Sequence, residues 1–390
     1  MKGARPFRID VSDDTLARIA DRVAAYRWFD PPEGDAWQRG MSTPVLKDVV
    51  DYWRTEYDWR AAEADLNRFD HFKAEIDGLG IHFVHVVGEA GGKRPLLLSH
   101  GWPGSIYEFW DVIDPLAFPS RHGGDPADAF DLVIPSLPGY GFSGKPKALV
   151  GQRATAELWD TLMRGVLGYR AYLAQGGDWG GLVTSWLGLN HDIQTGKGGC
   201  RAIHLNFMGF RPTPGKPETE EEARWLAHTS RMMQAEGAYL MMQGTKPQTL
   251  ALALMDTPVG QAAWILEKFH AWSDLGAGDL WGVYSRDQLL TNIMIYLVND
   301  AFATSVWYYR AFFEDGRAAL PEGVRCETPT GFANYPGERV FPMPPRSWCE
   351  RAYNVTYWQD QPKGGHFAAM EAPALFVDDI RNWARTLAED

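Results

Sequence analysis

Short apolar runs separated by longer amphipathic stretches mark the middle of the chain. Runs at 95–99, 131–135, 171–175 and 202–207 have the length of buried strands, and helix-like patterns lie between them. Upstream, 72–76 and 81–87 read as two strands joined by the turn Asp77-Gly78-Leu79-Gly80. Strands that alternate with helices are typical of a parallel sheet. The pattern therefore predicts an α/β fold with a mostly parallel central sheet and helices on both faces.

The flanking parts of the chain have different patterns. Residues 1–70 read as helical and irregular, with Asp13-Asp14 as the cap of an amphipathic helix over 15–26. Helices are expected near 219–242, 258–272 and 287–313, and the pairs Thr219/Glu222 and Ser285/Gln288 have capping-box spacing. Strand signals return near Arg339 and Asn354, before a helix over 373–387. We divide the chain into an N-terminal segment (1–70), a first core part (71–210), a helical lid (211–320) and a second core part (321–390).

Residues 171–181 join an apolar strand to an apolar helix, expected from about Leu182, through a glycine-flanked Asp178. A G-x-S-x-G elbow holds its nucleophile on such a strained turn and needs small neighbours. Here those neighbours are Gly176, Gly180 and Gly181. An aspartate is ordinarily ionised and needs no base for activation. Attack on saturated carbon would leave an ester that water can hydrolyse, whereas a serine would leave a stable ether.

Two other interpretations of this turn are weighed at this point. A helix-capping aspartate in a glycine-rich turn is common in α/β proteins. A dinucleotide-binding loop requires G-x-G-x-x-G, and residues 176–181 lack that spacing. The turn alone leaves the nucleophile and the capping aspartate both open.

A histidine and an acid are expected downstream, because the α/β-hydrolase triad runs nucleophile, acid, histidine. His366 follows the strand-like stretch 354–358 on a glycine-containing loop, and this position favours it as the base. Glu338, on the loop after the preceding strand, is the predicted acid. Asp360 is the competitor, but it lies only six residues before His366 and is expected to make a local turn.

The sequence His100-Gly101-Trp102-Pro103 directly follows the apolar run 95–99. In this fold a loop after an inner strand supplies an oxyanion donor. We expect the donors to be the backbone N–H groups of Trp102 and of Trp179, the residue after Asp178. Pro103 cannot donate and would stiffen the loop, and a cis Trp102–Pro103 bond fits this position. A purely structural turn is the alternative.

Together these motifs resemble the epoxide hydrolases of the α/β-hydrolase superfamily, in particular the microsomal and juvenile-hormone type. The likeness extends over nearly the whole chain, from Pro6-Phe7 and 52–60 at the front to 329–338 and 364–369 at the back. It implies an α/β-hydrolase fold whose core is wrapped by residues 1–70. It also implies that Asp178 is the nucleophile, Glu338 the charge-relay acid and His366 the base that activates water, with a vicinal diol as product.

The resemblance further implies two lid tyrosines that hold and protonate the epoxide oxygen. These match Tyr239 and Tyr309, although Tyr308 is adjacent and stays open. An alkoxide is a poor leaving group unless an acid donates to it, and a tyrosine can do so. Halide leaves without protonation, so the tyrosines weigh against a haloalkane dehalogenase, which is the closest alternative. A non-catalytic binder of hydrophobic ligands is the other alternative, but no triad position is lost.

The composition limits the classes of molecule that the protein is expected to bind. The net charge of −12 disfavours nucleic acid and anionic membrane surfaces, and no apolar run approaches the roughly 20 residues of a membrane span. The charged first 30 residues contain no signal peptide, and an odd, scattered set of three cysteines suits free thiols in a reducing compartment. We therefore expect a soluble cytoplasmic enzyme, with detoxification as its role.

We expect no cofactor and no metal, because His82 and His85, the closest histidine pair, would lie on opposite faces of a strand. The expected partners are a small hydrophobic epoxide and water. The sequence leaves open the natural epoxide, the ring carbon that is attacked, the preferred enantiomer and the oligomeric state, for which a homodimer is considered.

Overall fold

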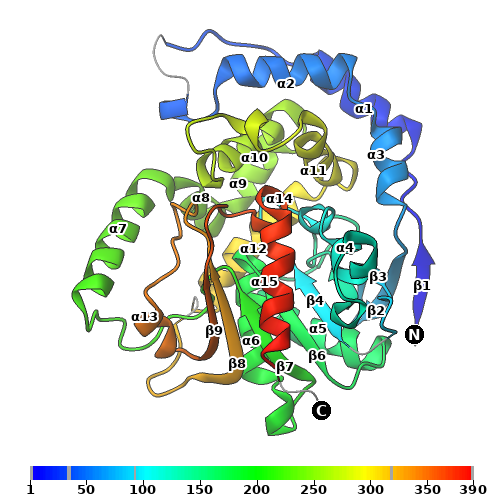
Figure 1. Cartoon of the computed structure of the whole chain (residues 1–390). Coiled ribbons are helices and arrows are strands. Elements are labelled where there is room, and N and C mark those ends of the chain that lie inside the picture. The colour runs from blue at the N-terminus through cyan, green and yellow to red at the C-terminus, as the bar shows by residue number, and fades with distance from the viewer. Residues whose placement is uncertain (1–2, 33–36, 92–93, 317–318, 388–390) are drawn as a thin grey trace.

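A nine-stranded sheet runs through the centre of the computed structural model, which describes residues 3–32, 37–91, 94–316 and 319–387 (Figure 1). Its spatial order is β1-β2-β3-β5-β4-β6-β7-β8-β9. The strands are β1 (Ala4–Phe7), β2 (His71–Ile76), β3 (Leu79–Val86), β4 (Pro95–Ser99), β5 (Asp131–Pro135), β6 (Tyr172–Gly176), β7 (Cys200–Leu205), β8 (Cys326–Asn334) and β9 (Tyr353–Asp360). Neighbours from β1 to β5 are antiparallel, and those from β5 to β9 are parallel. The predicted α/β fold with a mostly parallel sheet is confirmed.

Helices cover both faces of the sheet. Every residue of β4, β5 and β6 is buried, as the continuous apolar runs require for strands covered on both sides. On β7, Ile203 lies against α6 (Asp178–Asn190), whereas His204 Nε2 is 2.9 Å from Asp379 Oδ2 on α15 (Pro373–Arg385). Because successive side chains of a strand point to opposite faces, α6 and α15 lie on opposite sides of the sheet (Figure 1). The remaining core helices are α4 (Ile113–Ala117), α5 (Gln152–Asp160), α13 (Arg346–Glu350) and α14 (Ala368–Glu371).

Six helices lie within the range predicted for the lid. They are α7 (Glu220–Glu236), α8 (Ala238–Thr245), α9 (Pro247–Leu254), α10 (Pro258–Trp272), α11 (Arg286–Val298) and α12 (Phe302–Glu314). The capping box of Ser285 and Gln288 is confirmed. The other box forms only in part: the Thr219 hydroxyl accepts from the N–H of Glu222, but the Glu222 carboxylate accepts from the N–H of Glu218 instead of that of Thr219.

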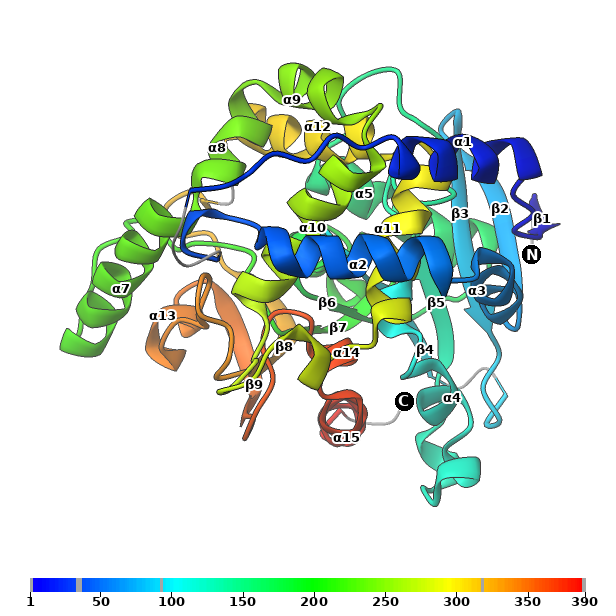
Figure 2. The same ribbon diagram turned by 90° about the horizontal axis from the view of Figure 1, so that it is seen from above.

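The N-terminal segment forms α1 (Asp13–Ala24), α2 (Thr43–Thr55) and α3 (Trp59–Leu66), which contact lid helix α11 above the core (Figures 1 and 2). The prediction that residues 1–70 are helical and irregular is wrong at β1, which pairs with β2. Its sequence, Ala-Arg-Pro-Phe, is too short and polar to signal a strand, and β2 provides the pairing. The predicted cap of α1 is also wrong, because Ser12 is the N-cap and accepts from the N–H of Thr15.

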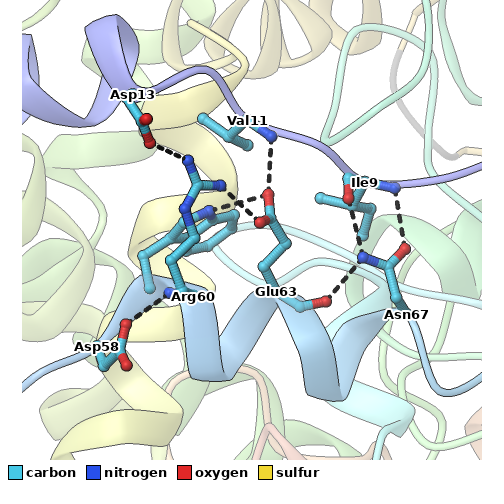
Figure 3. A network of polar contacts seen from close by, with 8 residues as sticks. Ile9, Val11, Asp13, Asp58, Arg60, Glu63 and Asn67 are labelled. Carbon is cyan, nitrogen blue, oxygen red and sulfur yellow. Dashed lines mark hydrogen bonds and ion pairs between the residues drawn. The ribbon is translucent and has the colours of Figure 1, made fainter.

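Polar contacts hold the extended stretch before α1 against α3 (Figure 3). The carboxylate of Glu63 accepts from the N–H of Val11 at 2.7 Å. The amide of Asn67 accepts from the N–H of Ile9 at 2.9 Å and donates to the Ile9 carbonyl at 2.8 Å. Glu63 also pairs with Arg60, at 2.6 Å. Since Ile9 and Val11 lie outside any helix or strand, these side chains satisfy backbone groups that secondary structure leaves unpaired.

Two further element boundaries differ from the prediction. Helix α6 begins at Asp178 rather than near Leu182. The strand expected near Arg339 is β8, which ends at Asn334. Its Pro329 and Gly331 weaken the strand signal, and its pairing with β9 is irregular at both places.

The three cysteines are free and buried, as predicted. Across the part of the chain that the structure describes, no single helix is both long and apolar enough to cross a membrane. Helices α11 and α12 meet the length and composition criteria only jointly, across a bend of 87°.

Candidate active site

Asp178 lies on a sharp turn between β6 and α6. Its φ of 48° is in the left-handed region, which is uncommon for residues other than glycine. The turn crosses the end of β4 so closely that a Cβ at Gly180 would lie 1.8 Å from the Ser99 carbonyl oxygen. Only glycine is compatible with this crossing, and the geometry is that of a nucleophile elbow. The Asp178 side chain is 13% exposed at the top of the sheet.

His366 and Glu338 meet Asp178 from the loops after β9 and β8. The His366 Nε2 atom is 3.5 Å from Asp178 Oδ2, and its Nδ1 hydrogen-bonds Glu338 Oε2. The other carboxylate oxygen of Glu338 accepts from the N–H groups of Val340 (3.1 Å) and Phe341 (3.0 Å). These bonds fix the carboxylate, which in turn fixes the plane of the imidazole.

Asp360, the alternative acid, lies away from this group. Its carboxylate accepts from the side-chain amide of Asn334 at 2.8 Å, at the ends of β9 and β8. It therefore joins the ends of two neighbouring strands instead of making the local turn expected from the sequence.

The electrostatics of His366 are set by the two carboxylates beside it. Burial by itself would lower the pKa of the imidazole, but the charges and hydrogen bonds of Glu338 and Asp178 outweigh burial and raise that pKa well above its ordinary value. His366 is therefore charged in this arrangement. Asp178 contributes to this shift together with Glu338.

The loop after β4 provides a hydrogen-bond donor to Asp178. The backbone N–H of Trp102 donates to Asp178 Oδ1 at 2.8 Å. A Cβ at Gly101 would lie 2.3 Å from the same oxygen, so only glycine permits this approach. The peptide bond between Trp102 and Pro103 is cis, as considered from the sequence. The N–H of Trp179 lies in the first turn of α6, where backbone donors have no partner within the helix.

His100 bonds this loop to the loop after β5. Its Nε2 accepts from the N–H of Leu137 at 3.1 Å, and its Nδ1 lies 3.0 Å from the Gly101 carbonyl oxygen. Burial lowers the pKa of His100 to about 4, so the ring is neutral and can accept at one nitrogen and donate at the other.

The same loop is bonded to the lid through residues that the sequence did not reveal. The side chain of Asn292 on α11 donates to the Pro103 carbonyl at 2.9 Å, and the Tyr296 hydroxyl donates to the Gly104 carbonyl at 2.6 Å. Both lie among the mainly apolar residues of 289–298 on this helix, which was the only available signal.

The lid brings Tyr239 and Tyr309 over the elbow. Tyr239, on α8, stacks on Trp102 with ring centroids 5.4 Å apart, and Tyr309, on α12, meets Trp179 edge-on at 4.5 Å. Their own rings are 5.9 Å apart. Burial, together with the nearby Asp178 carboxylate, raises the pKa of each well above its ordinary value. Both hydroxyls therefore hold their protons.

Tyr308 differs from its neighbour in where its hydroxyl lies. It hydrogen-bonds the Thr155 hydroxyl at 2.8 Å, on core helix α5. Within the described ranges, the buried Tyr309 hydroxyl has no hydrogen-bond partner of normal geometry. The Tyr308 hydroxyl is thus directed to the core, whereas the Tyr309 hydroxyl lies beside Tyr239 over the elbow.

A third carboxyl group, missed from the sequence, lies beneath the Trp102 loop. Glu108 packs so closely that a Cβ at Gly104 would be 1.5 Å from its Oε1. Burial raises the pKa of Glu108 to about 8 even though the His366 charge opposes the shift, and Asp178 adds to it. Glu108 lies on the short turn Ile106–Phe109, and nothing in the sequence marks it.

Chemically, the site combines a carboxylate with one oxygen held by an N–H group, an imidazole with its own carboxylate, and two protonated phenols. This set can attack an electrophilic carbon, donate protons to a departing oxygen, and activate water near the product of the first step.

The comparisons with known proteins agree on one family. Residues 4–109 match the family model described as epoxide hydrolase N terminus, and residues 94–234 match that of the alpha/beta hydrolase fold. The chain is similar to epoxide hydrolase 1 of Sus scrofa, at 34% identity over 413 residues, which cover 99% of this chain and 89% of that protein. It is 35% identical over 398 residues to juvenile hormone epoxide hydrolase 1 of Ctenocephalides felis, covering 96% of this chain and 84% of that protein.

Among solved structures, the Aspergillus niger epoxide hydrolase has a TM-score of 0.84 at 30% identity. The match covers 98% of this chain and 96% of that chain.

Proposed function

Because the chain belongs to the epoxide hydrolase family of the α/β-hydrolase fold, we propose that it converts an epoxide and water into a vicinal diol through an ester on Asp178. Membership makes the chain a hydrolase. The covalent route and the roles of individual residues are our proposal. One observation carries it: the Trp102 N–H is bonded to one oxygen of Asp178, and the other oxygen lies 3.5 Å from His366.

In the first step Asp178 attacks the epoxide. Oδ1 is held by the Trp102 N–H, so Oδ2 forms the new bond to a ring carbon while the ring carbon–oxygen bond breaks. The departing oxygen takes a proton from Tyr239 or Tyr309, which otherwise keep their protons because of their raised pKa. The products are an alkyl ester on Asp178, a new hydroxyl group and one phenolate.

In the second step His366 removes a proton from water, and the water oxygen attacks the ester carbonyl carbon. The negative charge that develops on Oδ1 is stabilised by the N–H groups of Trp102 and Trp179. Collapse breaks the bond from the carbonyl carbon to Oδ2, and the leaving alkoxide takes the proton from His366. The second proton of water leaves the new carboxylic acid for His366, which is charged in the resting site, so the sum is epoxide plus water to diol.

The charge on Asp178 determines the order of the two steps, because it affects the pKa of His366. In the resting site, Glu338 and Asp178 together keep the pKa of His366 well above its ordinary value, so the imidazole is already protonated and is no base. Ester formation removes the Asp178 charge and lowers the His366 pKa, so the imidazolium gives up its proton, which restores the phenol, and the neutral imidazole is free to act on water. The base becomes active only once there is an ester to hydrolyse.

Intact-protein mass spectrometry after mixing with styrene oxide tests this division of roles. His366→Gln should form the ester and stall, so its mass should increase by that of the epoxide. Asp178→Ala should never gain that mass. A His366→Gln protein that consumes no epoxide and gains no mass would contradict the proposal.

The haloalkane dehalogenase alternative is tested by the same measurement. It requires N–H donors aimed at a departing halide, and the indole N–H groups of Trp102 and Trp179 are buried without a partner in the described parts of the chain. With 1-bromobutane in place of the epoxide, our proposal predicts no adduct on His366→Gln. An adduct from the bromoalkane and none from a panel of epoxides would favour the alternative.

A further inference from the structure

We propose that Glu371 is a positioning residue that fastens the loop of His366 to the lid, and that this latch serves the hydrolytic half-reaction. The inference rests on the proposed function, because it assigns Glu371 to one of the two steps. Glu371 ends α14, five residues after His366.

Glu371 bridges two segments that are far apart in the sequence. One carboxylate oxygen accepts from the N–H of Phe367 at 2.8 Å, directly after His366. The other accepts from the N–H of Asp274 at 2.7 Å, two residues beyond the end of lid helix α10. A single side chain thus holds the base loop and the lid in fixed relation.

Two further bonds run between the same segments. The Asp274 carboxylate accepts from the N–H of Gly364 at 2.9 Å, and the N–H of His366 donates to the Trp272 carbonyl at 3.1 Å. Asp274 and Glu371 therefore act reciprocally, each accepting from the backbone of the other's segment. We call residues 272–274, 364–367 and Glu371 the latch.

The latch is packed too tightly for an ordinary side chain at its centre. A Cβ at Gly365 would lie 2.8 Å from both the Asp274 nitrogen and the Trp272 oxygen, and 2.9 Å from Glu371 Oε2. This explains the glycine beside the base. Because there is no free space at this point, the surrounding atoms cannot adjust to a change in the Glu371 carboxylate.

The latch contacts residues assigned to both half-reactions, but it holds His366 more directly than Tyr239. The Trp272 ring packs on the His366 ring at 4.8 Å and on the Tyr239 ring at 5.1 Å. The base loop is held by hydrogen bonds of the latch, whereas the contact described for Tyr239 is ring packing on Trp272. Loss of one latch bond should therefore disturb the orientation of His366 more than that of the tyrosine.

The charge of Glu371 is compatible with this role. Burial raises its pKa to about 7, although the two N–H groups and the His366 charge oppose that shift. Burying a carboxylate costs free energy even when two backbone N–H groups and an imidazolium lie beside it, so stability alone does not account for Glu371 at this position.

Glu371→Gln is the direct test. Glutamine keeps one acceptor and presents an NH₂ group to the other N–H, so one backbone donor loses its partner. With styrene oxide and rapid quenching, we expect ester formation within about twofold of wild type and ester hydrolysis slower by about tenfold or more. The ester should therefore accumulate in the variant.

Asp274 gives an independent test if Glu371→Gln folds poorly. Asp274→Asn keeps an acceptor for the Gly364 N–H and should behave like wild type, whereas Asp274→Ala should accumulate ester. Glu63→Gln is the matched control, because it removes a buried carboxylate that accepts from a backbone N–H in the N-terminal segment. It should lower the melting temperature without changing the ratio of the two rates.

Equal slowing of both half-reactions in Glu371→Gln, or no change in either, would overturn the latch proposal. If wild-type protein itself forms no ester, the proposed function fails and the latch proposal fails with it. If wild type forms the ester and only the variant result is negative, the latch alone is wrong.

Discussion

At the scale of single residues, the placement of His366 between two carboxylates connects the geometry to the proposed chemistry. Glu338 contacts Nδ1, and Asp178 lies 3.5 Å from Nε2. Both favour the charged ring, yet only Asp178 is consumed when the ester forms. The same event removes a charge that raises the pKa of both lid tyrosines. One covalent bond therefore changes the protonation equilibria of three side chains.

The choice between neighbouring tyrosines can be tested directly. Tyr309→Phe should slow ester formation by about 10²-fold and leave ester hydrolysis nearly unchanged, because one proton donor is lost while the ring is kept. Tyr308→Phe is the control, since it loses only the bond to Thr155. Rapid-quench measurement of both rates separates the two variants. A normal Tyr309→Phe beside an inactive Tyr308→Phe would reverse the assignment.

The acid beside His366 is tested by a matched pair of amide substitutions. Glu338→Gln should slow ester hydrolysis more than ester formation, because the imidazolium formed there loses its partner charge. Asp360→Asn should have little effect, since Asp360 bonds Asn334 at the strand ends. Steady-state and single-turnover rates give the comparison. Greater damage in the Asp360 variant would show that the wrong carboxylate was chosen.

At the scale of elements, the sequence was informative where one local pattern determines the structure. The elbow, the order of the triad, the loop at Trp102 and the lid helices follow from apolar runs, glycines and caps. The failures lie where tertiary pairing decides. β1 is too short to signal itself and depends on β2, and Pro329 and Gly331 obscure β8. Glu108, Asn292 and Glu371 were missed because their partners lie on other elements.

The attachment of the N-terminal segment is an element-scale prediction. Asn67→Ala removes the acceptor and the donor that pair with Ile9, and it should lower the free energy of unfolding by about 1–3 kcal/mol. Asp13→Ala, in the same network, removes a side chain that is 96% exposed and should cause no measurable change. Urea denaturation measures both. Equal effects would show that the network does not stabilise the segment through Asn67.

At the scale of the whole molecule, the N-terminal helices α1 and α2 lie over lid helices α10 and α11, and these lie over the core (Figure 1). The candidate site is between lid and core, because lid residues Tyr239 and Tyr309 pack on Trp102 and Trp179. Polar side chains cross both boundaries. Asn292 and Tyr296 join the lid to the Trp102 loop, and Glu371 joins it to the His366 loop. The catalytic groups of core and lid are therefore positioned by contacts that depend on the complete fold.

Stability should fall as pH rises from about 6.5 to 8. The pKa of Glu108 is raised to about 8 in the folded protein. Above about pH 4.5, Glu108 therefore binds its proton more tightly in the folded state than in the unfolded state. Unfolding releases this proton and is favoured by rising pH. Glu371 and His366 act in the same direction. Buried histidines with lowered pKa oppose this effect only below about 6.5, the ordinary histidine value.

Glu108→Gln should therefore reduce the fall in melting temperature between pH 6.5 and 8. Glu89→Gln is the control, because the Ser120 hydroxyl and N–H lower the pKa of Glu89, which places its contribution below pH 4.5. Differential scanning fluorimetry across this range gives both slopes. An unchanged slope in Glu108→Gln would mean that Glu108 does not hold its proton in the folded protein.

The covalent route through Asp178 is tested most directly by one turnover in H₂¹⁸O with enzyme in excess over an epoxide. In the proposed route water attacks the ester at the carbonyl carbon, so the new oxygen of the first diol would come from the enzyme carboxylate. The first diol should be unlabelled, and the heavy oxygen should appear in the peptide that contains Asp178. Label found mainly in the first-turnover diol, with none in that peptide, would contradict the ester intermediate and the role of the elbow.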